Sequence, residues 1–317
     1  MSALFLGIDG GGTKTAFVLI DADGRLLARH EATTSYYLEI GFDALRTLLR
    51  DGVQSTLQQA GVPTSDVAHT FAGLPAHGED SELLGGFSAL LTGVVPRSTI
   101  GNDMVCSWAG SLAGADGISL VAGTGSIAYG EWQGCAARCG GWGEVFGDEG
   151  SAHWLAREVL ALFSRMVDGR AEPGPLVGLV RAHFELAHDL DLCGEINGSA
   201  ARSELAQLAR LATAAANAGD AQARQLLVRA ADELALLAAG TARNLGLPAH
   251  QAVDVSYSGG VFAAGELVLG PLQAALQSRL PGAMLKRPRF GPELGAALYA
   301  ARLAGQPLSA QALARLA

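Results

Sequence analysis

A glycine-rich turn between two apolar runs, close to the start of the chain, most constrains how the chain can fold. Residues 7–15 read GIDGGGTKT, between the apolar runs 4–6 and 16–20. This pattern predicts a tight hairpin of buried strands. Three consecutive glycines let backbone N–H groups approach a ligand, and such a row of donors suits phosphate oxygens. Asp9 at the mouth of the turn could hold a magnesium ion, although an ordinary glycine hairpin with an exposed acid fits these residues too.

The opening pattern recurs about 110 residues later, which predicts two related halves. Strands are predicted at residues 4–6, 16–20, 25–32, 67–72, 98–100, 117–122, 127–132, 135–139 and 253–257, with a short one near Met284. Helices are predicted from Asp43 to Gly61, over 81–91, over most of 171–246, over 264–279, and after Pro292. A further helix is predicted after Ser151, marked by Leu155, Val159, Leu162 and Met166, and Asp220 is a good cap for a long helix within 171–246. This order is typical of mixed sheets with covering helices.

The length of 317 residues favours two domains. We expect an N-terminal domain over 1–115 and a C-terminal domain over 116–317. The C-terminal domain would carry a helical insertion over about 171–246, and its last helix would pack back on the N-terminal domain.

Charge and composition exclude several classes of protein. The formal net charge of −9 argues against nucleic acid or an anionic membrane as the main partner. No signal peptide and no apolar run of membrane-spanning length stand out. The four cysteines are too few and too scattered for a disulfide scaffold or a zinc site. We therefore expect a cytoplasmic protein with reduced thiols.

Glycine turns follow strands at four places: 10–13, 123–126, 140–143 and 259–260. Thr13 and Thr124 could each direct a hydroxyl at a phosphate, and the bare turn at 259–260 suits the close approach of a flat base. A need for tight connections explains any one turn, but not the arrangement. Other nucleotide and hydrolase motifs are missing: glycine never precedes lysine, the first glycine turn leads into a strand, and no GxSxG elbow occurs.

Three acidic residues could take part in chemistry. Asp103 ends a predicted strand and, with an ordinary pKa, would be ionised at neutral pH and able to accept a proton from an attacking hydroxyl. Its alternative role is to cap the following helix. Asp148 and Glu149 lie between glycines at a predicted helix start, where they contact substrate hydroxyls or complement the helix dipole.

Together these segments resemble the N-acetylglucosamine kinase family, which belongs with the BadF-type ATPases in the sugar kinase, Hsc70 and actin superfamily. The resemblance spans nearly the whole chain, and its most specific part is the block from Gly140 to Ser151, GGWGEVFGDEGS. It implies an α/β fold of two ribonuclease-H-like domains with mixed five-stranded sheets. These would close on MgATP and an amino sugar in a nucleotide cleft, often in a homodimer.

The resemblance also assigns roles to residues. Asp9 would organise Mg²⁺, directly or through water, and Asp103 would be the base for the sugar 6-hydroxyl. The ATP phosphates would be held by Gly11, Gly12, Thr13, Gly123, Thr124 and Gly125, and adenosine would be flanked by Gly259 and Gly260. The sugar site would be lined by Ser35, Gly141, Trp142 and Asp148.

Two positions depart from the family pattern. The vertebrate enzymes have asparagine directly after Gly-Thr-Gly-Ser, where this chain has Ile127, and a sugar-contacting asparagine in the loop that here reads TSYY at 34–37. Because unmatched polar contacts dominate substrate discrimination, N-acetylglucosamine, glucosamine and a related hexosamine all stay open.

We predict an ATP-dependent kinase that phosphorylates an amino sugar at the 6-hydroxyl, with two alternatives beside it. An activating ATPase of a dehydratase would need cysteines that share an iron–sulfur cluster, which Cys106, Cys135 and Cys139 do not resemble. A non-catalytic sugar sensor on a kinase fold is the other. Related regulators carry a DNA-binding module, for which we expect neither room before Leu4 nor a suitable surface.

Overall fold

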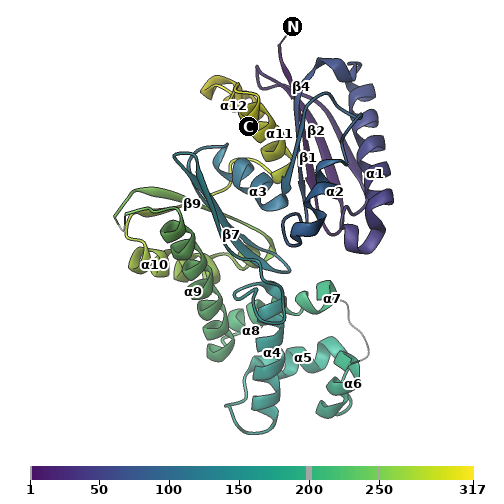
Figure 1. The fold of residues 1–317 in the computed structure, drawn as a ribbon. Helices are drawn as coiled ribbons and strands as arrows, with labels where there is room; N and C mark the ends of the chain where they lie inside the picture. The colour runs from purple at the N-terminus through teal and green to yellow at the C-terminus, as the bar shows by residue number, and fades with distance from the viewer. Residues whose placement is uncertain (1, 198–201, 249) are drawn as a thin grey trace. The chain divides into compact units, whose positions relative to one another are not determined.

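The structure is a computed structural model that describes residues 2–197, 202–248 and 250–317, and it divides into two compact units (Figure 1). The first unit runs to Asp116 and takes up the chain again over Arg287–Ala317. The second unit is Gly117–Lys286. Each unit has a five-stranded sheet and a hydrophobic core of its own.

The sheet of the first unit has the strand order β3-β2-β1-β4-β5. Its strands are β1 (Leu4–Gly10), β2 (Thr15–Asp21), β3 (Leu26–Ala32), β4 (Val67–Leu74) and β5 (Ser98–Asn102). The strands β1, β2 and β3 form an antiparallel meander, and β4 and β5 run parallel to β1. Gly10 pairs with Thr15, so that residues 11–14 form the turn and the predicted hairpin is confirmed.

The sheet of the second unit repeats this scheme in the order β10-β9-β6-β7-β8. Its strands are β6 (Gly117–Ala122), β7 (Ser126–Trp132), β8 (Cys135–Gly140), β9 (Val253–Ser258) and β10 (Ala283–Lys286). Again the first three strands form an antiparallel meander, and the last two are parallel to its first strand. The prediction of two related halves with mixed five-stranded sheets is therefore confirmed.

The first unit's helices are α1 (Tyr37–Ala60), α2 (Leu84–Ser88), α3 (Asp103–Leu112), α11 (Pro292–Leu303) and α12 (Ala310–Leu316), with 3₁₀ turns at Thr64–Asp66 and Ser81–Leu83. Helix α1 begins before the predicted Asp43, and Gly41 interrupts it with a φ of 78°. The predicted helix over 81–91 is wrong in its length, since only the short α2 forms there. Gly85 and Gly86 explain this, because glycine weakens a helix interior.

The second unit's helices are α4 (Ala152–Val167), α5 (Pro175–Phe184), α6 (Leu192–Asn197), α7 (Arg202–Ala206), α8 (Ala209–Asn217), α9 (Ala221–Asn244) and α10 (Glu266–Arg279), with 3₁₀ turns at Asp189–Asp191 and Gly260–Ala264. Asp220 caps α9 by accepting hydrogen bonds from the backbone nitrogens of Gln222 and Ala223, both at 3.0 Å. Helix α9 packs on the sheet of its unit. In the parts of the chain that the structure describes, no helix combines the length and the apolar character needed to cross a membrane.

Residues 287–317 belong with the first unit, where α11 packs against β1 and α3. Glycines make this close approach: a Cβ on Gly7 would collide with the backbone of Ala297, and one on Gly295 with the carbonyl oxygen of Cys106. The predicted C-terminal domain over 116–317 therefore differs from the second compact unit in its end, because residues 287–317 belong to the first unit. An apolar helix face in the sequence indicates burial, but it does not identify the sheet that the helix covers.

Candidate active site

In the first unit, two predicted site carboxylates lie at one edge of the sheet. Asp9 is the next-to-last residue of β1, and Asp103 follows β5 directly as the first residue of α3. Because β1, β4 and β5 are parallel, their carboxyl ends meet at this edge. The cap of α3 is Asn102, whose Oδ1 accepts a hydrogen bond from Met104 N at 3.1 Å. The capping role considered for Asp103 thus falls to its neighbour.

The first turn of α3 lies close against the sheet. A Cβ on Gly73, near the end of β4, would collide with Cys106 Sγ and come within 3.0 Å of Asp103 Cα. The buried thiol of Cys106 donates a weak hydrogen bond to the carbonyl of Ile8 at 3.8 Å. Gly73 and Cys106 therefore fix where Asp103 lies. The sequence analysis missed both, although Gly73 directly follows a predicted strand.

Burial governs the electrostatics of this edge. It raises the pKa of Asp9 to about 8, with the negative charges of Asp103 and Glu293 adding to the effect. Burial also raises the pKa of Asp103 to about 6, and the nearby charge of Glu79 contributes. The pKa of Asp103 thus lies above the ordinary value of an aspartate, and a pKa near 6 leaves the carboxyl group mostly ionised at neutral pH.

The loop that precedes α1 is attached to the glycine turn of the first unit. Ser35 N and Thr34 Oγ1 both donate hydrogen bonds to the carbonyl of Gly11 at 3.2 Å, and Thr15 Oγ1 donates to Thr33 O at 2.8 Å. The Ser35 side chain is 1% exposed, and its hydroxyl has no hydrogen-bond partner among the described residues. The predicted sugar loop and the predicted phosphate turn are thus one connected feature.

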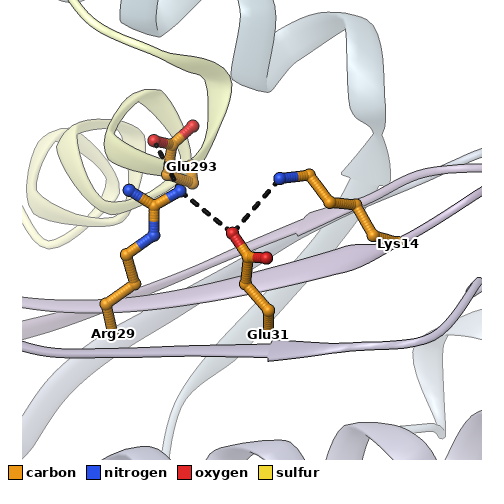
Figure 2. A network of polar contacts seen from close by, with 4 residues as sticks. All are labelled: Lys14, Arg29, Glu31 and Glu293. Atoms are coloured by element: carbon orange, nitrogen blue, oxygen red, sulfur yellow. Dashed lines mark hydrogen bonds and ion pairs between the residues drawn. The ribbon is translucent and has the colours of Figure 1, made fainter.

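A chain of opposite charges runs from the glycine turn across β3 to α11 (Figure 2). Lys14 Nζ lies 3.1 Å from Glu31 Oε1, which also accepts from Arg29 Nη2 at 3.1 Å. The same guanidinium nitrogen lies 3.5 Å from Glu293 Oε1. Glu293 was not predicted as a site residue, because its neighbours in the sequence carry no motif and only the return of α11 brings it here.

In the second unit, the glycine turn 123–126 is joined to the start of α4. Ala152 N donates to Gly123 O at 2.9 Å, and His153 N donates to Thr124 O at 3.2 Å. Asp148, with a φ of 58° and a side chain that is 3% exposed, accepts from Ser126 N at 3.3 Å. The turn and the predicted sugar residue Asp148 therefore share one hydrogen-bonded structure.

The predicted adenosine turn lies against the same glycine turn. Gly259 has a φ of 107°, and a Cβ there would collide with the carbonyl of Ala122 and come within 2.9 Å of Gly123 N. Only glycine fits so close an approach of two backbones. The second unit therefore brings together Gly123, Asp148 and Gly259, which sequence reasoning had selected separately.

The predicted sugar block continues into an open loop. Gly141 N donates to Ser126 O at 2.9 Å, and a Cβ on Gly141 would come within 2.7 Å of Ile127 Cδ1. Ile127, the residue that departs from the vertebrate pattern, thus packs directly under this block. Trp142 is 64% exposed, and the Arg138 guanidinium lies 5.6 Å from the centroid of its ring.

Comparison with known proteins identifies the family. Residues 6–300 match the BadF/BadG/BcrA/BcrD ATPase family. The chain belongs to this family. It is 28% identical over 313 residues to the N-acetyl-D-glucosamine kinase of Dictyostelium discoideum, covering 94% of this chain and 97% of that protein. It is also 28% identical over 261 residues to the N-acetylmuramic acid/N-acetylglucosamine kinase of Clostridium acetobutylicum, covering 81% and 85%.

A solved structure with the same fold is the putative N-acetylglucosamine kinase from Chromobacterium violaceum. Its TM-score is 0.74 at 28% identity, covering 94% of this chain and 98% of that one. The family resemblance and the two-domain α/β fold that the motifs predicted are confirmed. Both groups of site residues described above lie within the stretch that matches the ATPase family.

A large open groove of this family member lies away from these residues. Its volume is about 650 Å³, and it is lined by residues of β3 and α1, among them Ala32, Ile40 and Leu48. None of the predicted site residues lines it. Because the carboxylates and glycine turns lie elsewhere, this groove is not the candidate active site, despite its size.

Proposed function

We propose that this member of the ATPase family is an ATP-dependent kinase that transfers the γ-phosphate to the 6-hydroxyl of an amino sugar, N-acetylglucosamine or glucosamine. The observation that carries the proposal is the position of Asp103: it follows β5 at the same sheet edge as Asp9, which lies near the end of β1 just before the glycine turn. The names of the two relatives described above support the choice of an amino sugar.

The glycine turns are the proposed contacts for ATP. Gly12 and Thr13 are exposed, so their backbone N–H groups and the threonine hydroxyl are accessible to phosphate. Gly123, Thr124 and Gly125 supply the corresponding turn of the second unit, held in shape by the start of α4. Gly259 and Gly260 are the proposed adenosine contacts: Gly259 brings its backbone against that turn, and Gly260, where a Cβ would meet nothing within 4 Å, leaves open space.

Magnesium fits the residues around Asp9. Asp9 is half-buried, and the charges of Asp103 and Glu293 add to burial in raising its pKa to about 8. Carboxylates that repel one another are stabilised by a divalent cation, and magnesium prefers oxygen ligands. Within the described ranges no three His, Cys, Asp or Glu side chains form a complete metal cage. This suits an ion that takes one or two carboxylates and completes its shell with phosphate and water. Such an ion would shield the phosphate oxygens.

Asp103 is the proposed base. Its carboxylate, mostly ionised at neutral pH, accepts the proton of the sugar 6-hydroxyl as that oxygen attacks the γ-phosphorus and ADP leaves. Asp148, Gly141 and Trp142 are the proposed sugar contacts in the second unit, and Ser35 is the proposed sugar contact in the first. The exposed Trp142 residue offers an apolar face, and the buried carboxylate of Asp148, which also accepts from Ser126 N, would be a charged acceptor for a sugar hydroxyl.

A dehydratase activator fits the cysteines less well. Cys106 is fully buried against Ile8 and Gly73, whereas Cys135 and Cys139 lie on β8 of the other unit. An iron–sulfur cluster shared at an interface needs accessible thiolates close together.

The test is ADP release over a panel of sugars, with wild type and Asp103→Ala. We expect stimulation by N-acetylglucosamine or glucosamine, and a fall in the variant by a factor of about 10² to 10⁴. A sugar whose 6-hydroxyl is replaced by hydrogen is the matched control and should not stimulate release. A rate that is the same in both proteins would remove Asp103 as the base. ATP binding without stimulation by any sugar would instead favour a sensor.

A further inference from the structure

The starting point is the way in which α11 lies on β1. Gly7 and Ala297 meet with no space for a side chain between them. Asp9 lies two residues after Gly7, on the same face of β1. Glu293 lies four residues before Ala297, on the same face of α11. The two carboxylates therefore belong to facing surfaces, and the charge of Glu293 acts on Asp9.

Packing and one ion pair limit where Glu293 can point. Its side chain is 19% exposed, and Arg29 Nη2 lies 3.5 Å from Oε1. The carboxylate folds back over Gly291, since a Cβ there would lie 2.5 Å from Glu293 Oε2. Figure 2 shows that Arg29 lies between Glu293 and Glu31, so a single guanidinium is divided between two carboxylates.

Carboxyl groups therefore outnumber cationic groups at the sheet edge, which contributes to the raised pKa of Asp9. Asp9, Asp103 and Glu293 are three carboxylates, and Lys14, the other nearby cation, is paired with Glu31. Magnesium usually keeps several of its waters, and carboxylates that accept hydrogen bonds from those waters tune its affinity. Glu293 is suited to that role because its charge acts on Asp9 while Arg29, 3.5 Å from Oε1, orients its carboxylate.

We propose that Glu293 is a positioning residue of the magnesium site, whose carboxylate accepts hydrogen bonds from water on the ion held at Asp9 and is oriented by Arg29. This inference rests on the proposed function, because that function brings magnesium and ATP to Asp9. It adds a residue from a distant part of the chain to a magnesium site for which the sequence indicated Asp9 alone.

The experiment measures the binding of Mn²⁺, which serves as the probe because electron paramagnetic resonance follows its binding directly. Mn²⁺ is titrated into the full-length protein saturated with ADP, for wild type, Glu293→Gln and the matched control Glu31→Gln. We expect the dissociation constant of Mn²⁺ to rise by about 10- to 100-fold in Glu293→Gln. In Glu31→Gln, which removes the same charge from the exposed part of the network, it should change by less than about fivefold.

A second measurement separates this role from a structural one. ADP affinity without any divalent ion, measured by calorimetry in a chelator, should be the same in wild type and Glu293→Gln. A change of Mn²⁺ affinity below about fivefold in Glu293→Gln would overturn the inference. So would an equal loss of ADP affinity with and without the ion, or an absence of Mn²⁺ binding in wild type. None of these measurements uses a sugar, so a protein that phosphorylates no sugar but loses Mn²⁺ affinity in Glu293→Gln would contradict the kinase proposal alone.

Discussion

The two glycine turns occupy equivalent places in the two sheets, yet their surroundings differ. Each turn joins the first two strands of its meander, β1 to β2 and β6 to β7. The first turn follows Asp9 and is attached to the loop at Thr34 and Ser35. The second has no acid in it, and it is held by the start of α4 and by Asp148. One scaffold is therefore used twice: Asp9 and Asp103 lie at the turn edge of the first sheet, whereas Asp148 lies beside the turn of the second.

The sharpest test of this difference compares two aspartates. If proton transfer depends on the first unit, Asp103→Asn should lower kcat by a factor of about 10² to 10⁴ and change the sugar KM little. If Asp148 only binds sugar, Asp148→Asn should raise the sugar KM by about 10- to 100-fold, because hydrogen bonds to charged groups contribute roughly 1.5–3 kcal/mol. Steady-state kinetics over sugar concentration separates the two. A large fall in kcat for Asp148→Asn with an unchanged KM would contradict this division.

The second prediction concerns the dependence of kcat on pH, with an expected change of about tenfold per pH unit. Burial raises the pKa of Asp103 to about 6, and the base works only when it is ionised. The rate constant kcat should therefore be constant above pH 7 and fall about tenfold per unit below pH 6. The residual activity of Asp103→Asn should lack this fall. A profile that stays flat down to pH 5 would mean that another group accepts the proton.

The smallest expected effect compares two buried serines. Ser126 Oγ donates to Glu149 O at 2.7 Å, so Ser126→Ala should lower the free energy of unfolding by about 1 kcal/mol. The hydroxyl of Ser35 has no partner among the described residues, so Ser35→Ala should leave that free energy unchanged or raise it slightly. Urea unfolding measures both. A rise in the sugar KM of Ser35→Ala without loss of stability would support a role of Ser35 in sugar binding. A clear loss of stability in Ser35→Ala would contradict the expectation that its hydroxyl makes no stabilising hydrogen bond.

The sequence predicted the features that depend on local patterns. Alternating apolar runs and glycines indicated both meanders, and Asp220 marked the start of α9 correctly. The features that the sequence did not predict depend on contacts between distant segments. Nothing near Glu293 or Gly73 in the chain reveals that α11 and α3 pack on β1 and β4. The raised pKa of Asp103 was not predicted for the same reason, because its burial depends on how the sheet edge packs.

The packing of α11 also affects the order in which the protein can be assembled. Trp108 on α3 is fully buried, with Tyr299 and Arg302 of α11 against its ring. A ribosome completes every residue of the second unit before it makes α11. A nascent chain that ends at Asp116 therefore has its five strands but leaves Gly7 and Trp108 uncovered. Domains generally fold in order from the N-terminus during synthesis. Here the N-terminal unit, with its acidic edge, has to wait until residues 287–317 have been made.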